Sequence, residues 1–245
     1  LDQAATARLL GTDGYAGGLL DRRGGRLQPL AYARALARAA IGLGAAIHGA
    51  SPVTGLARDG DAWRLTTPGG SLRSKRVLLA TNGYTDRLWP GLARSIVPAM
   101  SYQAATAPLS DNLRRSILPE GHVVSGTRRL LAYYRLDSAG RLVLGGRGRF
   151  KESDDPADYR HIQARLKELF PQLGEPQWQF FWGGKVALTL DHLPHAHELA
   201  PGLMAALGYN GRGVAMASRM GAAMAEWAAG LPAAGLPLPP SAMHP

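Results

Sequence analysis

The chain has 245 residues, of which 46% are hydrophobic, and this is enough for a sizeable core in one large domain or two interleaved ones. It has no cysteine, which excludes disulfides, thiolate zinc sites, iron–sulfur clusters and cysteine nucleophiles, and which fits a cytoplasmic protein. The formal net charge is +10, but the arginines are scattered, without a dense basic run or an RNP-like strand, so we expect a solvated surface and no nucleic-acid partner.

The chain begins with LDQAATARLLGTDGY, which has neither an initiator Met nor a signal-peptide pattern, and we expect it to come from the middle of a longer protein. Residues 12–28 are rich in glycine and predict short strands and turns. The next stretch predicts a helix from Pro29 to about Gly44, because proline suits a first turn and glycine a C-terminal stop. No apolar run approaches the roughly 20 residues of a membrane helix.

Strand-forming segments follow the helix predicted from Pro29, and the last of them predicts a parallel sheet. Residues 45–48 and 51–53 predict a strand entering a turn, and residues 61–73 predict a hairpin around the PGG at 68–70. The run from Val77 to Ala80 is continuously apolar and ends in a small polar turn. This pattern is typical of a strand covered on both faces, and ligands commonly bind at the C-terminal end of such strands.

From Val97 the pattern changes to alternating strands. The segments at 97–109, 121–127, 129–137 and 141–148 predict an antiparallel sheet with a hairpin turn at 137–140. A helix should follow, capped by Asp155, ended by Pro171, and apolar along one stripe made of Tyr159, Ile162, Leu166, Leu169 and Phe170. Such a helix would cover one face of the sheet and leave the other face free for a ligand. Residues 177–191 return to strand.

The last elements are a strand, a glycine-rich turn at 208–214 and a long alanine-rich helix, followed by a proline-rich tail that we expect to be loose. Glycines let backbone approach a ligand, and a helix N-terminus offers free N–H groups. A phosphate, or the pyrimidine edge of a reduced flavin, would suit this place. Tight packing is an equally good explanation of the turn by itself, and its spacing does not match the dinucleotide fingerprint GxGxxG.

Other motifs carry less information. The run from Asp191 to Glu198 contains three histidines, but its spacing matches no regular ligand set, so we expect a polar surface loop bent by Pro194 and no metal. The sequence has no G-x-S-x-G elbow, P-loop or H-E-x-x-H, which leaves hydrolase and NTPase functions without support. Tyr134 and Trp182 lie near predicted strand ends or turns, and each could lie in the core or face a ligand. Lys185 could face solvent or contact a ligand.

Several segments together resemble the D-amino-acid oxidase/glycine oxidase superfamily of FAD-dependent amine oxidoreductases. They are PLAYARALARAAIGLGAAIHGASPV, KRVLLATNGYT, LDHLPH and LGYNGRGVAMASRMG, in family order and at family-like intervals. The finer pattern, including TNGYTDRLWP, SGTRRLLAYYRLD and GKVALTLDHLPHAHELAPGL, is similar to the γ-glutamylputrescine oxidase-like branch. The N-terminal GxGxxG segment of the family is absent from this chain.

The resemblance implies an α/β fold in which an incomplete Rossmann-like FAD-binding domain is interleaved with an antiparallel-sheet substrate domain. Residues 27–90 and 200–230 would belong to the FAD-binding domain, and residues 1–26 and 91–199 to the substrate domain. The cofactor FAD would contact the following residues: Val53, Ala80, Thr81, Asn82, Gly83, Gly208, Tyr209, Asn210, Gly211, Arg212, Gly213 and Val214. The substrate would contact Tyr134, Trp182 and Lys185.

The implied chemistry is hydride transfer from the carbon beside an amine to flavin N5, after which the imine hydrolyses to an aldehyde or keto acid and ammonia. Dioxygen or another acceptor would reoxidise the flavin. This reaction needs orientation and dehydration more than a strong base, and the sequence identifies no catalytic residue. The alternative is a non-catalytic binding or assembly module, or a subunit that another chain completes.

Overall fold

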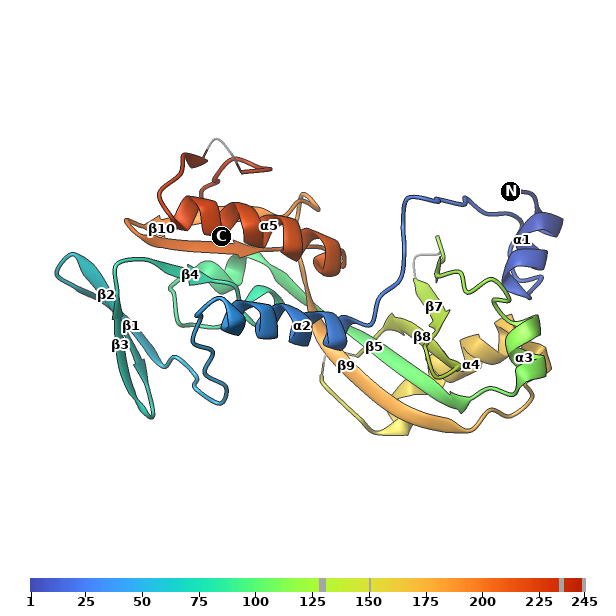
Figure 1. Ribbon diagram of the computed structural model, residues 1–245. Coiled ribbons are helices and arrows are strands. Elements are labelled where there is room, and N and C mark those ends of the chain that lie inside the picture. The colour runs from blue at the N-terminus through green and yellow to red at the C-terminus, as the bar shows by residue number, and fades with distance from the viewer. Residues whose placement is uncertain (128–130, 150, 234–235, 244–245) are drawn as a thin grey trace. The chain divides into compact units, whose positions relative to one another are not determined.

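We describe a computed structural model of the chain, which covers residues 1–127, 131–149, 151–233 and 236–243 (Figure 1). The chain divides into two compact units, each built from two stretches of sequence. The first unit comprises Leu1–Tyr32 and Met100–Gly184, and the second Ala33–Ala99 and Lys185–Pro245. Residues 91–99 and 185–199, which the sequence assigned to the substrate domain, lie in the second unit. In the described part, no helix combines the length and apolarity needed to cross a membrane.

The first unit is built on a five-stranded sheet with the order β6-β7-β8-β5-β9. Its strands are β5 (Val97–Pro108), β6 (Val124–Ser125), β7 (Ala132–Leu136), β8 (Arg141–Arg147) and β9 (Trp178–Leu188). The pairs β6–β7, β7–β8 and β5–β8 are antiparallel, as the alternating sequence predicted. Residues 128–130 lie outside the described residues; they include the first two residues of the strand predicted at 129–137.

The predicted helix over this sheet is confirmed. It begins as a 3-10 turn (Pro156–Tyr159) and continues as α4 (Arg160–Leu169), and the Asp155 carboxylate accepts a hydrogen bond from the Ala157 N–H at 2.9 Å. The predicted stripe is buried in the core between α4 and the sheet: Tyr159, Ile162, Leu166, Leu169 and Phe170. One sheet face is therefore closed by α4.

Two short helices in this unit were not predicted. They are α1 (Gln3–Leu10) and α3 (Asp111–Ser116). The signal for α1 was present at both ends, since Asp2 caps its first turn and Gly11 adopts φ 74° at its C-terminus. The short strands expected at 12–28 are wrong: this segment is irregular apart from one isolated bridge between Asp2 and Gly17.

The described residues of the second unit form two three-stranded sheets. One is antiparallel, with β1 (Gly55–Asp59), β2 (Ala62–Thr67) and β3 (Gly70–Ser74) in that order, and it extends the predicted hairpin by a strand. The other has the order β10-β11-β4 and combines β4 (Val77–Leu79), β10 (His195–Ala200) and β11 (Leu203–Leu207). Helix α5 (Gly213–Ala228) packs on one face of this sheet, as Figure 1 shows.

Helix α2 (Pro29–Gly42) confirms the predicted helix, but it buries no residue and leaves Leu36 and Ile41 half exposed. The strand predicted at 45–48 and 51–53 is wrong: these residues adopt no regular structure. A strand persists only when a neighbour satisfies its backbone N–H and C=O groups. A local apolar pattern cannot supply that neighbour.

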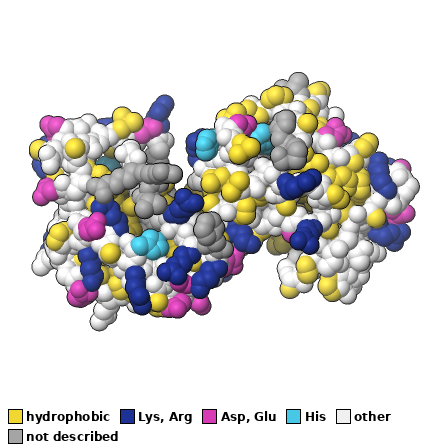
Figure 2. Space-filling view, turned by 180° about the vertical axis from the view of Figure 1, so that it is seen from behind, with side chains coloured by type: hydrophobic (Ala, Val, Ile, Leu, Met, Phe, Trp, Pro, Cys, Tyr) yellow, Lys and Arg dark blue, Asp and Glu magenta, His cyan; other side chains and the backbone are white. Residues whose placement is uncertain are grey.

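The polar loop predicted around the histidines is also wrong in part. His195–Ala200 forms strand β10, and His197 is only 2% exposed. The tail is not loose where it is described: the Ser241 N–H donates to the Ala196 carbonyl at 2.9 Å, and Leu236 is buried. The tail therefore binds the edge of β10. On the face shown in Figure 2, Lys and Arg side chains are spread out and form no single patch.

Candidate functional site

The two segments predicted to bind the cofactor meet at one edge of a sheet. Strands β4 and β11 are parallel neighbours, with Leu79 opposite Ala205, so their C-terminal ends lie side by side. Residues 80–83 leave the first strand and residues 208–214 leave the second. The Asn82 Oδ1 atom accepts a hydrogen bond from the Gly208 N–H at 3.0 Å, which joins the two segments directly. Ligands bind at this kind of edge in α/β sheets.

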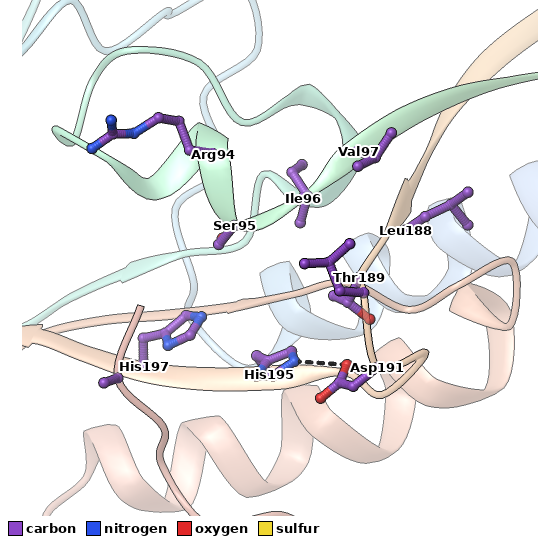
Figure 3. Close-up of a pocket in the computed structure, with 11 residues that line it drawn as sticks. Arg94, Ser95, Ile96, Val97, Leu188, Thr189, Asp191, His195 and His197 are labelled. Carbon is purple, nitrogen blue, oxygen red and sulfur yellow. Dashed lines mark hydrogen bonds and ion pairs between the residues drawn. The ribbon is translucent and has the colours of Figure 1, made fainter. Parts of the chain in front are cut away.

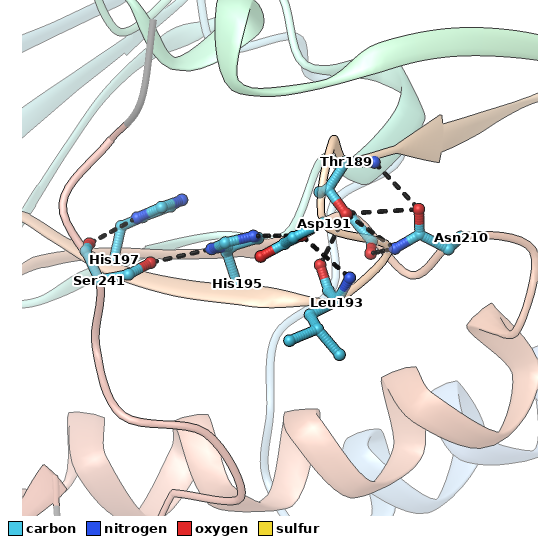
Figure 4. Close-up of polar contacts among 8 residues, drawn as sticks. Thr189, Asp191, Leu193, His195, His197, Asn210 and Ser241 are labelled. Carbon is cyan, nitrogen blue, oxygen red and sulfur yellow. Dashed lines mark hydrogen bonds and ion pairs between the residues drawn. The ribbon is translucent and has the colours of Figure 1, made fainter.

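Asn210 connects the glycine turn to the end of β9 by hydrogen bonds. Its Oδ1 atom accepts from the Thr189 N–H at 2.9 Å, its Nδ2 donates to Thr189 Oγ1 at 3.0 Å, and its own N–H donates to the Ala187 carbonyl at 3.0 Å (Figure 4). Gly208 adopts φ 81°, and a Cβ atom there would lie 2.4 Å from the Thr189 methyl group. These contacts fix the turn without any ligand, so packing alone explains Gly208 and Asn210.

Gly211 and Gly213 differ from Gly208, because a Cβ atom at either position would not clash with a neighbouring atom. A Cβ atom at Gly211 would have no atom within 4 Å, and one at Gly213 would meet only Tyr209, at 3.9 Å. Gly213 is the first residue of α5. The N-cap residue is Arg212, and its side chain makes no capping hydrogen bond to the helix. The turn therefore combines open space with free helix N–H groups. These features fit a flat ligand on which negative charge develops, as the flavin ring would be.

Gly83 is explained by packing against β9. A Cβ atom there would lie 2.6 Å from the Lys185 carbonyl oxygen. Lys185 is exposed and held on the other side by Tyr84: its backbone N–H donates to the Tyr84 hydroxyl at 3.3 Å, and its Nζ lies 5.2 Å from the centre of that ring. The lysine is thus placed beside the 80–83 turn, with its ammonium group resting on an aromatic face.

The remaining residues predicted to contact FAD have varied surroundings. Tyr209 is 9% exposed and packs in the core against α5, and burial raises the pKa of its hydroxyl. Val53 is half-buried in the segment before β1. The other four are exposed: Ala80, Thr81, Arg212 and Val214. Their contacts with a cofactor stay predictions.

Tyr134 and Trp182 were both predicted to contact the substrate, but only Trp182 lies on the open face of the sheet in the first unit. Tyr134 is 3% exposed and packs edge-on against Phe170 beneath α4, which argues against the substrate contact predicted for it. Tyr133 lies on the opposite face, because successive side chains of a strand alternate. Trp182 also lies on that open face and is 43% exposed, since its neighbour Gly183 faces Tyr102 in the core.

The partners of Tyr133 on this face were not predicted. The Tyr133 hydroxyl is hydrogen bonded to the Ser101 hydroxyl and to the Gln103 side chain. Ser101 and Gln103 alternate with the buried residues Tyr102 and Ala104 along β5. That alternation was visible in VPAMSYQAAT, but assigning the faces needed the position of α4.

A separate cavity of about 230 Å³ lies in the second unit, between the start of β5, the end of β9 and β10 (Figure 3). On its wall, His195 donates from Nε2 to Asp191 at 3.1 Å, and its Nδ1 lies 2.9 Å from the Ser241 hydroxyl (Figure 4). Hydrogen bonds from the Leu193 N–H and then from His195 lower the pKa of Asp191 to about 2. Among the described residues, no group of three or more His, Cys, Asp or Glu could hold a metal ion. This network attaches the tail to β10.

Comparison with known proteins gives a consistent result. Residues 1–227 match the family model described as FAD dependent oxidoreductase, abbreviated DAO. The chain is 34% identical over 232 residues to the probable oxidoreductase OrdL of Haemophilus influenzae, covering 92% of this chain and 52% of that protein. It is 34% identical over 228 residues to the gamma-glutamylputrescine oxidoreductase of Escherichia coli, covering 92% of this chain and 53% of that protein.

Solved structures agree on the fold. Glycine oxidase from Geobacillus kaustophilus superposes with a TM-score of 0.67 at 23% identity, over 80% of this chain and 53% of that one. Iminodiacetate oxidase from Chelativorans sp. BNC1 gives a TM-score of 0.70 at 16% identity, over 85% of this chain and 56% of that one. The chain thus spans about half the length of the relatives it matches.

Proposed function

The chain belongs to the family of FAD-dependent oxidoreductases, and on this premise we propose that it supplies part of the FAD site and the substrate-facing sheet of an amine oxidoreductase. The protein that carries out the reaction would be about twice as long, as its relatives are. The observation that carries the proposal is the joined edge of β4 and β11, where the 80–83 and 208–214 segments share a hydrogen bond and leave open space above Gly211.

In this proposal, FAD is held by the residues around that edge. The backbone of Gly211 and Gly213 would hold the flavin ring, and the N–H groups at the start of α5 would stabilise the negative charge that the ring gains on reduction. Asn82 and Asn210 keep the two segments in place through their hydrogen bonds. The other contacts would be made by Val53, Ala80, Thr81, Gly83, Gly208, Tyr209, Arg212 and Val214.

FAD, when bound, accepts a hydride from the carbon beside a neutral amine and passes the electrons to dioxygen or another acceptor. The residues of this chain orient the amine and exclude water, so that the substrate stays close to the reacting position and the imine forms in a dry site. Trp182 on the open sheet face supplies an apolar wall. Water then hydrolyses the imine to an aldehyde or keto acid, and releases ammonia from a primary amine substrate or a primary amine from a secondary amine substrate.

We propose that the substrate is a primary or secondary amine that carries a carboxylate at some distance from the nitrogen. One relative is named for γ-glutamylputrescine, which is an acylated diamine with a free carboxylate. Lys185 is exposed beside the 80–83 turn and is the residue we assign to the carboxylate. A charge-assisted contact of this kind contributes about 1.5–3 kcal/mol.

The test is anaerobic flavin reduction followed by stopped flow, with the full-length protein that contains this chain and a panel of amines. Each carboxylate-bearing amine is paired with its uncharged amide. Faster reduction by the acids at low concentration would support the proposed substrate class. Equal reduction by acids and amides would remove the carboxylate from the proposal. If no amine bleaches the flavin, the protein is better explained as a binding or assembly module.

A further inference from the structure

A cavity of about 560 Å³ lies beside α4, at one end of the sheet face that this helix covers. The residues that line it all belong to the first unit and come from the start of β7, the end of β8 and one side of α4. Its apolar wall contains side chains from each of these places: Leu131, Ala132, Leu144, Ile162 and Ala164. Ligand sites commonly have a volume of about 300–1,000 Å³ and a mainly apolar lining. We call this space the α4 cavity, and its charged residues determine which ligand it suits.

The charged and polar residues of the α4 cavity are Arg147, His161, Arg165 and Glu168. The last three lie along one side of α4, because helix positions four and seven residues apart share a face. His161 Nε2 lies 2.8 Å from the Arg147 carbonyl oxygen, which connects α4 to the end of β8 at the cavity. The lining therefore combines two arginines with a single carboxylate, and its net charge is positive.

Arg165 is the residue that indicates an anionic ligand. Its side chain is only 21% exposed, and its Nη1 donates to Glu168 Oε2 at 2.8 Å. The Glu168 side chain is 64% exposed, and an ion pair with so solvated a partner contributes little. Within the described part of the chain, no other group accepts a hydrogen bond from the Arg165 guanidinium, although a guanidinium has five N–H donors. A largely buried cation with unused donors needs a further acceptor.

We propose that the α4 cavity binds a small organic acid with an apolar body, whose carboxylate accepts hydrogen bonds from the Arg165 guanidinium. A guanidinium can present two parallel N–H donors to one carboxylate, which makes this pair strong and well oriented. The apolar wall takes the hydrocarbon part of the ligand. An amine would meet the like charge of the two arginines, and an uncharged ligand would lose the charge-assisted contact. The inference does not depend on the proposed function, because none of these residues was assigned to FAD or to the amine.

The experiment measures the binding of octanoate, octan-1-ol and octylamine to the FAD-loaded full-length protein by isothermal titration calorimetry. The three probes share one hydrocarbon chain and differ in head group. Octanoate should bind at least about 10-fold more tightly than octan-1-ol, and octylamine should bind most weakly. In Arg165→Gln the affinity for octanoate should fall about 10- to 100-fold, the range expected for one charge-assisted contact, and that for octan-1-ol should change less than about twofold. Arg160→Gln is the matched control, because Arg160 is an exposed residue of α4 that does not line the cavity.

Two further variants test the site without removing Arg165. Glu168→Gln removes the competing carboxylate and should tighten octanoate binding about 2- to 5-fold. Ala164→Trp places a ring at an exposed helix position on the cavity wall and should abolish binding of both octanoate and octan-1-ol. Circular dichroism checks that each variant is folded. The proposal is overturned if octanoate does not bind at millimolar concentration or binds no better than octan-1-ol. It is also overturned if octanoate binding is insensitive to both Arg165→Gln and Ala164→Trp, which would place the acid elsewhere on the protein.

Discussion

Gly213→Ala separates a role of the glycine turn in flavin binding from a role in folding. Gly213 is the first residue of α5, it does not adopt a positive φ, and an added Cβ would meet only Tyr209 at 3.9 Å. Alanine favours a helix over glycine by about 0.5–1 kcal/mol, so the substitution should leave the free energy of unfolding unchanged or slightly higher. A loss of flavin in this variant therefore cannot come from a weakened fold.

Gly211→Ala is the matched variant, because it adds the same methyl group two residues earlier. No atom lies within 4 Å of that Cβ, but the backbone there has φ 82°, a conformation that costs an L-residue about 1–2 kcal/mol. We expect this variant to lose both stability and flavin. Gly213→Ala should lose flavin alone, with a dissociation constant at least about 10-fold higher, which corresponds to about 1.4 kcal/mol.

The assay uses the full-length protein and two measurements on each variant. Flavin content and affinity come from absorbance and fluorescence titration, and the free energy of unfolding comes from denaturant titration followed by circular dichroism. Full flavin affinity in Gly213→Ala would refute a role of this glycine in flavin binding. A loss of stability equal to the loss of flavin affinity would also refute it, because the glycine would then serve packing.

Three further predictions address the cofactor, the substrate and pH. The 245-residue chain alone should bind FAD weakly, because it lacks a GxGxxG turn for the diphosphate, and submicromolar affinity in a fluorescence titration would contradict this. Lys185→Met in the full-length protein should raise the apparent KM for carboxylate-bearing amines roughly 10- to 100-fold, with a smaller effect on the limiting reduction rate in stopped flow. Asp191→Asn should destabilise the fold at neutral pH, and the difference from the wild type should shrink as the pH falls from about 4 towards 2, because the lowered pKa of Asp191 stabilises only the ionised form. A difference that is constant across this range in denaturant titrations would contradict the role of the Asp191 hydrogen bonds.

The sequence alone predicted the elements whose signals are local. Three signals located α4: the cap at Asp155, the stop at Pro171 and the apolar stripe between them. The structure confirms each of them. The apolar run from Val77 to Ala80 located β4, and the glycines from Gly208 onwards located the turn before α5. Each pattern lies within about 20 residues, where helix and strand periodicity are strongest. The family resemblance was likewise visible, because it depends on the order of such segments.

Only the tertiary structure decided which side chains share a face. Tyr133 and Tyr134 are neighbours with the same side chain, and the alternation of β7 places one over the open face and the other in the core. The local sequence did not say which, because a shift of one residue exchanges the two faces and the choice depends on where α4 packs. Tertiary structure also decided which segments became strands. Residues 195–200 form β10 because they pair with β11, whereas residues 45–48 adopt no regular structure. A strand depends on hydrogen bonds to residues far away in the chain, and a local pattern contains no information about those residues.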